Sequence, residues 1–210
     1  MPMSITITNT RPEHIPQLVA HQRLCFPTMN PDDWMDAEMF AAQIAVFPEG
    51  QHVALDGERV VGQSSTFRVS GALALAPHTY RGITGHNRFT NHDPAGEWLY
   101  GADMSVHPDY RGRHIATMLY STRKELVRRL GMRGIVAGGA LPGYHHHSDR
   151  LSVEQYIAEV VAGRLVDPTL TVQLKNGFTV RAVLRNYVDG GELVNDDATL
   201  LVWEPDNTEP

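Results

Sequence analysis

Two arginines and a glycine stand directly before an amphipathic helix, and residues of these types in this order suit the binding of a phosphate group. The run is Tyr110-Arg111-Gly112-Arg113-His114-Ile115-Ala116, and a helix is expected from residue 112 to residue 130. The first turn of a helix exposes backbone N–H groups that have no partner and carries the positive end of the helix dipole. Arginine side chains add charge, and a glycine lets a ligand approach the backbone closely. The run therefore predicts a site for phosphate or diphosphate.

A strand must deliver the chain to this helix, and residues 98–106 have the composition of one. Side chains alternate along a strand, so Asp103 and Ser105 should face one way and Met104 and Val106 the other. The chemistry-bearing residues are therefore expected where a strand ends and a helix begins.

This segment resembles the coenzyme A signature of the GNAT superfamily of N-acetyltransferases. The signature has Gln or Arg, two residues, Gly, one residue, and then Gly or Ala. Arg111 and Ala116 fill its first and last places, while His114 stands where the family has its central glycine. The run Gln173-Leu174-Lys175-Asn176-Gly177-Phe178 is similar to the end of the family's last helix and the Gly-Phe pair after it. The C-terminal half further resembles acetyltransferase domains that are fused to carbon–nitrogen hydrolases.

The resemblance implies one domain over residues 1–210, with residues 142–166 inserted between a core strand and the last helix. It implies an α/β (α+β) fold: a mixed, mostly antiparallel sheet flanked by helices, with strands that splay apart at the cofactor site. The implied activity is the transfer of an acetyl group from acetyl-CoA to a primary amine by direct attack. The residues expected to hold coenzyme A are Met104, Ser105, Val106, Arg111, Gly112, Arg113, His114, Ile115, Ala116 and Thr117.

The resemblance also directs the search for acid and base groups. Asp103 and Glu97 are the best candidate bases, because their strand leads to the expected position of the thioester. His107 is either a further base or a half-exposed loop residue. Members of the superfamily often carry a proton-donating tyrosine four residues before the Gly-Phe pair, where this chain has Gln173, which cannot act as an acid. Tyr144 is a candidate substitute, with water as the alternative proton donor.

Strand-like and helix-like segments alternate along the chain, which favours α/β layers over an all-α or all-β core. Asp56-Gly57 predicts a hairpin turn, and residues 70–97, which show no clear period, are expected to form a long loop with at most one strand-like piece. Arg123 and Lys124 are interpreted as solvated charges on the helix. Further strands are expected at residues 4–8, 51–55, 59–69, 135–139, 179–187 and 198–203. Four further helices are expected: one after residue 10, one over residues 33–47, one that begins at residue 152 and one over residues 169–176.

The composition excludes several classes of protein and site. A net charge of -6 over 210 residues argues against general nucleic-acid binding. The single cysteine, Cys25, excludes an intrachain disulfide and is expected to be a buried thiol. Consecutive side chains in the run His145-His146-His147 do not easily converge on one ion, so no metal site is expected. Neither a signal peptide nor a stretch that could cross a membrane is visible, and a cytoplasmic protein is expected.

Two functions stay open at this point. The first is an N-acetyltransferase with a small-molecule or peptide amine as acceptor, possible as a homodimer. The second is an acyl-CoA-binding or sensing domain without turnover. The two departures from the family pattern, His114 and Gln173, are the reason to retain this alternative. A nucleotide-binding domain is disfavoured, because the chain has neither a GxGxxG after a strand nor a GxxxxGK[ST]. The segments 70–97 and 142–166 are expected to shape the acceptor pocket.

Overall fold

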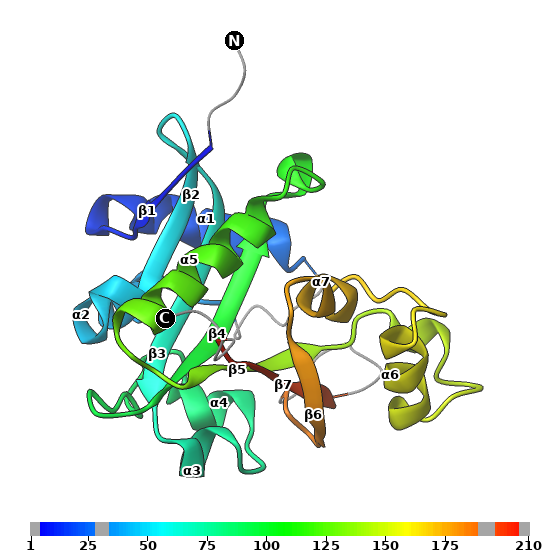
Figure 1. Ribbon diagram of the computed structural model, residues 1–210. Coiled ribbons are helices and arrows are strands. Elements are labelled where there is room, and N and C mark those ends of the chain that lie inside the picture. Colours follow the sequence, from blue (N-terminus) through cyan, green and yellow to red (C-terminus); the bar gives the residue numbers. More distant parts are fainter. Residues whose placement is uncertain (1–4, 28–33, 189–195, 206–210) are drawn as a thin grey trace.

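The computed structural model describes residues 5–27, 34–188 and 196–205, and the strands of this part of the chain form one sheet (Figure 1). Its order is β1-β2-β3-β4-β5-β7-β6, and every neighbouring pair is antiparallel except β4 and β5. This mixed, mostly antiparallel sheet confirms the predicted fold class. The strands are β1 (Ile5–Asn9), β2 (Gln51–Asp56), β3 (Arg59–Val69), β4 (Trp98–Val106), β5 (Gly134–Ala140), β6 (Thr179–Leu184) and β7 (Ala198–Trp203).

Helices cover both faces of the sheet, because β2 and β3 carry apolar side chains on both sides. Val53 and Val60 pack against α1 and α2, whereas their neighbours Ala54 and Val61 pack against α5. In Figure 1, α5 crosses the front of the sheet and α1 lies behind it. The helices are α1 (Ile15–Cys25), α2 (Ala37–Val46), α3 (Gly71–Ala74), α4 (Tyr80–Thr84), α5 (Ile115–Arg129), α6 (Val153–Val161) and α7 (Leu170–Lys175), with 3-10 turns η1 (Pro12–His14), η3 (Pro48–Gly50), η4 (Pro108–Tyr110) and η5 (Tyr144–His146).

The hairpin prediction is confirmed, since β2 and β3 pair around Asp56 and Gly57, and Gly57 has a φ of +60°. The prediction of one long loop over residues 70–97 is wrong. Two short helices, α3 and α4, interrupt it, and Ser70 and Thr79 cap them by accepting bonds from main-chain N–H groups. Each helix is only four or five residues long, too short to show a helical period.

Two further expectations concern element ends and length. The helix expected over residues 33–47 begins at Ala37, with Asp36 as its N-cap, and residue 33 lies outside the described residues. No helix among the residues that the structure describes is long and apolar enough to cross a membrane.

Candidate functional site

The two central strands separate in the middle of the sheet. β4 and β5 pair only from Trp98 opposite Gly134 to Gly101 opposite Ala137. Beyond Gly101, β4 continues along β3 while β5 continues along β7, so the strands diverge (Figure 1). We call the opening between residues 102–106 and 138–140 the splay. The β4 residues there, apart from the buried Ser105, are partly exposed, although the strand is central. The structure therefore has the splayed strands that the resemblance implies.

A β-bulge marks the point where the splay begins. Ser65 of β3 pairs with Asp103, but Thr66 pairs with Gly101, so Ala102 is an extra residue on β4. A bulge changes the direction in which the following side chains and peptide groups point, and bulges occur often beside active sites. Here the bulge turns the second half of β4 away from β5.

The hydrogen-bond phase of β4 decides which peptide groups face the splay. The N–H of His107 donates to the carbonyl of Val61 at 2.9 Å, so the alternate residue Ser105 also directs its main chain toward β3. Met104 and Val106 are out of phase and direct their N–H and C=O groups to the open edge. A free strand edge can pair with an extended ligand. Met104 and Val106 are therefore suited to bind by main chain, whereas the main chain of Ser105 is directed to β3.

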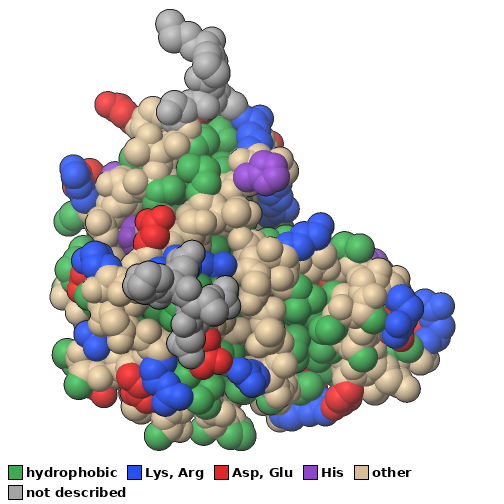
Figure 2. All heavy atoms as spheres, in the orientation of Figure 1, with side chains coloured by type: hydrophobic (Ala, Val, Ile, Leu, Met, Phe, Trp, Pro, Cys, Tyr) green, Lys and Arg blue, Asp and Glu red, His purple; other side chains and the backbone are tan. Residues whose placement is uncertain are grey.

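The start of α5 lies beside this edge and presents cationic side chains to solvent. Arg111, Gly112, Arg113 and His114 are all exposed, and Figure 2 shows basic and histidine side chains gathered over the loop that precedes α5. The Nε of Arg111 donates to the carbonyl of Val106 at 3.3 Å. The guanidinium of Arg113 lies 4.8 Å from the ring centre of Tyr110. These contacts hold both arginines next to the first turn of the helix.

The first turn of α5 provides main-chain donors. Ile115, Ala116 and Thr117 are its first three residues, and the N–H groups of a first turn have no partner within the helix. The Ile115 side chain is buried under the sheet, while Thr117 is exposed. Ile115 and Ala116 therefore offer N–H groups, and Thr117 offers an N–H and a hydroxyl, at the positive end of the helix dipole.

His114 adopts the backbone conformation that the family's glycine would favour. It is the N-cap of α5, with φ +61° and ψ +13°, in the left-handed region. A side chain in this region costs roughly 1–2 kcal/mol. The family signature has glycine there because glycine adopts this conformation without a Cβ penalty.

We expect His114→Gly to raise the free energy of unfolding by about 0.5 kcal/mol, since relief of the left-handed strain exceeds the added entropy of the unfolded chain. Urea unfolding measures the change. Gly112→Ala is the matched control: Gly112 has φ +76°, and a Cβ added to it would meet no atom within 4 Å, so its loss of stability, about 1 kcal/mol, reports the same balance of backbone strain and unfolded-chain entropy without a steric clash. An unfolding free energy that falls in His114→Gly would contradict this account.

Asp103 lies on the face of β4 that meets α1. Its Oδ2 accepts a bond from Gln22 Nε2 at 2.8 Å and another from the amide of Gln63. Burial raises the pKa of this carboxyl, against the bond from Gln22 and the charge of Arg123, which lower it. Asp103 as a whole residue is nevertheless partly exposed, and it lies beside the bulge. The two amide side chains therefore fix the position of the Asp103 carboxylate at the beginning of the splay.

A histidine that the sequence analysis missed lies beside Ser105, two residues after Asp103. His21 of α1 is 2% exposed, and its Nε2 is 3.0 Å from Ser105 Oγ and 3.3 Å from Cys25 Sγ. Burial lowers the pKa of His21 to about 4 and raises that of the Cys25 thiol to about 11. Both groups are therefore uncharged at neutral pH. The prediction that Cys25 is a buried thiol is confirmed.

Acid should destabilise the protein through its buried histidines. Burial lowers the pKa of His52, like that of His21, to about 4, whereas the unfolded chain binds these protons near pH 6.5. The unfolded state thus binds more protons between these values, so stability is full above pH 6.5 and falls toward pH 4. Each histidine contributes up to about 3 kcal/mol. Urea unfolding across this window should show the slope in the wild type and a flatter one in the His21→Gln, His52→Gln double variant. An equal slope in both would refute the assignment.

His107 is buried, not half-exposed as one interpretation had it. It is 7% exposed, and its Nε2 lies 3.0 Å from a guanidinium nitrogen of Arg59. A guanidinium only donates, so this ring nitrogen accepts and carries no proton in the contact. His107 therefore forms part of the support beneath the loop that leads to α5.

Glu97 precedes the first residue of β4, whereas Asp103 lies within the strand, just after the bulge. Glu97 directly precedes the strand, on the side where β4 and β5 are paired, and its Oε1 accepts the N–H of Gly71 at 3.0 Å. Asp103 is six residue steps farther on, about 20 Å along a strand. The structure does not bring the two candidate carboxylates together.

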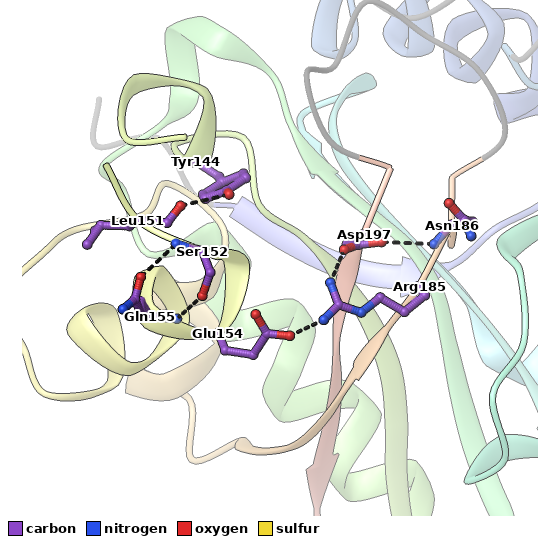
Figure 3. Close-up of polar contacts among 8 residues, drawn as sticks. All are labelled: Tyr144, Leu151, Ser152, Glu154, Gln155, Arg185, Asn186 and Asp197. Carbon is purple, nitrogen blue, oxygen red and sulfur yellow. Dashed lines mark hydrogen bonds and ion pairs between the residues drawn. The ribbon is translucent and has the colours of Figure 1, made fainter. Parts of the chain in front are cut away.

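Tyr144 lies in the segment that follows β5. It is 8% exposed, and its hydroxyl donates to the carbonyl of Leu151 at 2.9 Å (Figure 3). A capping box of Ser152 and Gln155 begins α6 in the same view, at the residue where a helix is expected to start. Glu154 of α6 pairs with Arg185, which joins the segment to the end of β6. The hydroxyl of Tyr144 is therefore engaged within the 142–166 segment.

The histidine run that follows does not form a metal site in the described structure. The rings of His145 and His146 are 3.6 Å apart, and His145 Nδ1 contacts the carbonyl of Pro142 at 2.6 Å. Among the residues placed by the structure, no group of three or more His, Cys, Asp or Glu side chains is arranged to hold a metal ion.

The interpretation of Arg123 as a solvated charge is wrong. Arg123 is 2% exposed and extends from α5 beneath the bulge. Its Nη2 donates to the carbonyls of Asp103 and Ser65, and its Nε donates to Ser64 Oγ at 2.7 Å. Lys124 is partly buried, with its Nζ 2.7 Å from the carbonyl of Asn176. Arg123 therefore holds the backbone of the strand that bends away from β5.

Gln173, at the family's tyrosine position, is buried on the α5 side of the sheet. Its Oε1 has no hydrogen-bond partner among the described residues and lies close to Gly139. Its side chain bonds to the hydroxyl of Tyr120, and burial raises the pKa of that phenol. Neither Gln173 nor Tyr120 is charged at neutral pH.

Comparisons with known proteins agree with this geometry. The family model described as Acetyltransferase (GNAT) family matches residues 15–148. An uncharacterized N-acetyltransferase of Bacillus subtilis (strain 168), YkwB, is 32% identical over 202 residues, covering 96% of this chain and 89% of that protein. A probable hydrolase of the same organism, YhcX, is 34% identical over 199 residues, covering 95% of this chain but 38% of that protein, so the chain spans well under half of this relative.

Among solved structures, the GNAT-like decarboxylase GphF in complex with isobutyryl-CoA has a TM-score of 0.77 at 20% identity, covering 95% of this chain and 98% of that one. At this sequence identity the similarity shows a shared fold and no more. The family match spans the splay and the start of α5, and it agrees with the sequence of the relative named as an N-acetyltransferase. The chain belongs to the acetyltransferase (GNAT) family and is an acyltransferase with coenzyme A as the carrier of its acyl group.

Proposed function

We propose that this protein transfers an acetyl group from acetyl-CoA to a primary amine of a small molecule or peptide. The observation that carries the proposal is the arrangement of three features along β4: an open strand edge at Met104 and Val106, a helix start with two exposed arginines beyond it, and a held carboxylate, Asp103, at the bulge. From Gly101 to Val106 the edge is five residue steps, about 17 Å long. The diphosphate binds at the α5 end, and the thioester lies toward Gly101.

The chemical step is direct attack. The amine nitrogen forms a bond to the thioester carbonyl carbon, the carbon–sulfur bond breaks, and coenzyme A leaves as a thiolate. We assign to Asp103 the acceptance of the amine's proton through water, because it is the carboxylate at the splay and its pKa is raised. Solvent protonates the thiolate, since the hydroxyl of Tyr144 is engaged with Leu151. Glu97 has no part in this scheme, because it lies at the paired end of β4.

A thiol-release assay tests the proposal. Wild-type protein is mixed with acetyl-CoA and a panel of amines (polyamines, aminoglycosides and lysine peptides), and free thiol is followed against a reaction without amine. Amine-dependent thiol release supports the transfer reaction. Tight binding of acetyl-CoA with no release on any amine favours the second candidate, an acyl-CoA-binding domain, whose supporting observation is the non-acidic Gln173 buried at the tyrosine position.

A further inference from the structure

Three side chains form a hydrogen-bonded row beside the point where β4 and β5 separate. His78 Nε2 lies 2.8 Å from the hydroxyl of Tyr100, and that hydroxyl lies 2.9 Å from the hydroxyl of Tyr187. Tyr100 is fully buried, Tyr187 is 3% exposed, and His78 is half-buried. The row therefore leads from the interior of the protein toward its surface.

The donors and acceptors of the row have one consistent order. His78 Nδ1 lies 2.8 Å from the carbonyl of Ala76, which only accepts, so Nδ1 carries the proton. In the neutral ring Nε2 then accepts from the hydroxyl of Tyr100. The oxygen of Tyr100 is left to accept from the hydroxyl of Tyr187. All the protons of the row are thus directed from Tyr187 toward His78.

The inner end of the row lies at the splay. Tyr100 is the β4 residue before Gly101, where pairing with β5 ends, and Gly138 is the first β5 residue beyond that pairing. A Cβ on Gly138 would lie 2.1 Å from Cζ of Tyr187, so the phenol ring rests on bare backbone there. Tyr100 and Asp103 face the same side of the sheet, because their β3 partners, Phe67 and Ser65, are two residues apart. Burial and, after it, the negative charge of Asp103 raise the pKa of Tyr187.

We propose that Tyr187, Tyr100 and His78 form a proton relay that carries the acceptor amine's proton from the Asp103 side of the splay to solvent. This inference rests on the proposed amine acetyltransferase activity and adds to it the route by which the proton leaves. The row gives a proton accepted by Asp103 a hydrogen-bonded path toward the surface before the next turnover.

The relay step is balanced in protons. The proton that leaves the amine nitrogen passes by way of Asp103 to the oxygen of Tyr187, whose own proton moves to the oxygen of Tyr100. The proton of Tyr100 moves to Nε2 of His78, and the imidazolium of this half-buried side chain then gives its Nδ1 proton to water in place of the carbonyl of Ala76. Proton exchange between the two ring nitrogens through water restores the starting tautomer. Burial lowers the pKa of His78, so the ring is unprotonated at neutral pH and ready to accept.

Steady-state thiol release by substituted enzymes tests the relay. Tyr187→Phe, Tyr100→Phe and His78→Gln should each lower kcat at least about 10-fold, less than the roughly 10²- to 10⁴-fold effect of losing a general base itself, with an unchanged KM for acetyl-CoA. Glutamine still accepts a hydrogen bond from Tyr100 but does not carry a proton onward, so a merely structural role of His78 would survive this change. Tyr80→Phe is the matched control, since its ring also packs on Tyr187 while its hydroxyl donates to Asn87, and it should keep kcat within twofold.

Chemical rescue provides a second test that does not depend on the folding of the tyrosine variants. Imidazole should restore part of the kcat of His78→Gly, whereas pyrazole, of the same shape but far less basic, should not. If the kcat of Tyr187→Phe equals that of the wild type, or if pyrazole rescues His78→Gly as well as imidazole does, the relay is wrong and the proposed acetyltransferase activity stands. A wild-type protein that binds acetyl-CoA but acetylates no amine overturns both proposals.

Discussion

Asp103→Asn should lower kcat for amine acetylation by roughly 10²- to 10⁴-fold while leaving the affinity for coenzyme A within twofold. The amide keeps nearly the same shape and still accepts one of the bonds from Gln22 and Gln63, but it does not take a proton. The diphosphate site at the start of α5 is several residues away along β4, so cofactor binding is unaffected. Initial rates of thiol release and calorimetry with coenzyme A measure the two quantities.

Glu97→Gln is the matched comparison, since both carboxylates belong to the same strand in the sequence-based prediction. Because Glu97 accepts the N–H of Gly71 at the paired end of β4, this change should leave kcat within a factor of two. If Glu97→Gln reduced kcat as strongly as Asp103→Asn, the assignment of the site to the splayed end of the strand would be wrong.

The second large effect concerns Arg123. Arg123→Ala should lower the free energy of unfolding by about 3 kcal/mol or more, because it leaves the carbonyls of Asp103 and Ser65 and the hydroxyl of Ser64 buried without their donor. The bulge that turns β4 away from β5 also loses its support. We therefore expect weaker coenzyme A binding even under conditions in which the variant is folded.

Arg129→Ala, on the same helix, is the control for Arg123. Its guanidinium is exposed and pairs with Glu49 at 3.1 Å, and a surface ion pair of this kind contributes about 0–1 kcal/mol. Urea unfolding of both variants compares a buried with an exposed arginine in one helix. Equal losses of stability in the two variants would show that Arg123 does not hold the bulge.

The sequence predicted the helices and strands well where a hydrophobic pattern continued over several turns, or where residues typical of turns and helix caps marked an end. The Asp56-Gly57 hairpin, the capping box at Ser152 and the helix after Gly112 follow from local rules. The prediction for residues 70–97 failed because α3 and α4, with four and five residues, are shorter than the several turns over which a helical period can be recognised. Only their caps, Ser70 and Thr79, were signals that could have been read.

The parts of the candidate site that depend on the main chain and on the motif before α5 could be predicted from the sequence. The α5 start and the phase of Met104 and Val106 follow from the alternation of a strand and from the dipole of a helix. Arg123 was misread because its charge suggested solvent, although it lies four residues after Leu119 and three before Leu126, on the apolar face.

The partners of β4 from distant segments were beyond local rules. His21 reaches Ser105, and Tyr187 reaches Tyr100, over sequence separations of more than eighty residues. No periodicity connects positions so far apart, and only the sheet order β4-β5-β7-β6 brings Tyr187 to the end of β5. The polar surroundings of the splay therefore became visible only in three dimensions.

A crystal structure of the protein with coenzyme A tests the central assignment most directly. We expect oxygens of the diphosphate within roughly 3 Å of the main-chain nitrogens from Arg113 to Ala116, and the thiol between Gly101 and Gly138, beside Asp103. A diphosphate bound elsewhere on the protein, or a thiol directed away from the separation of β4 and β5, would contradict the account.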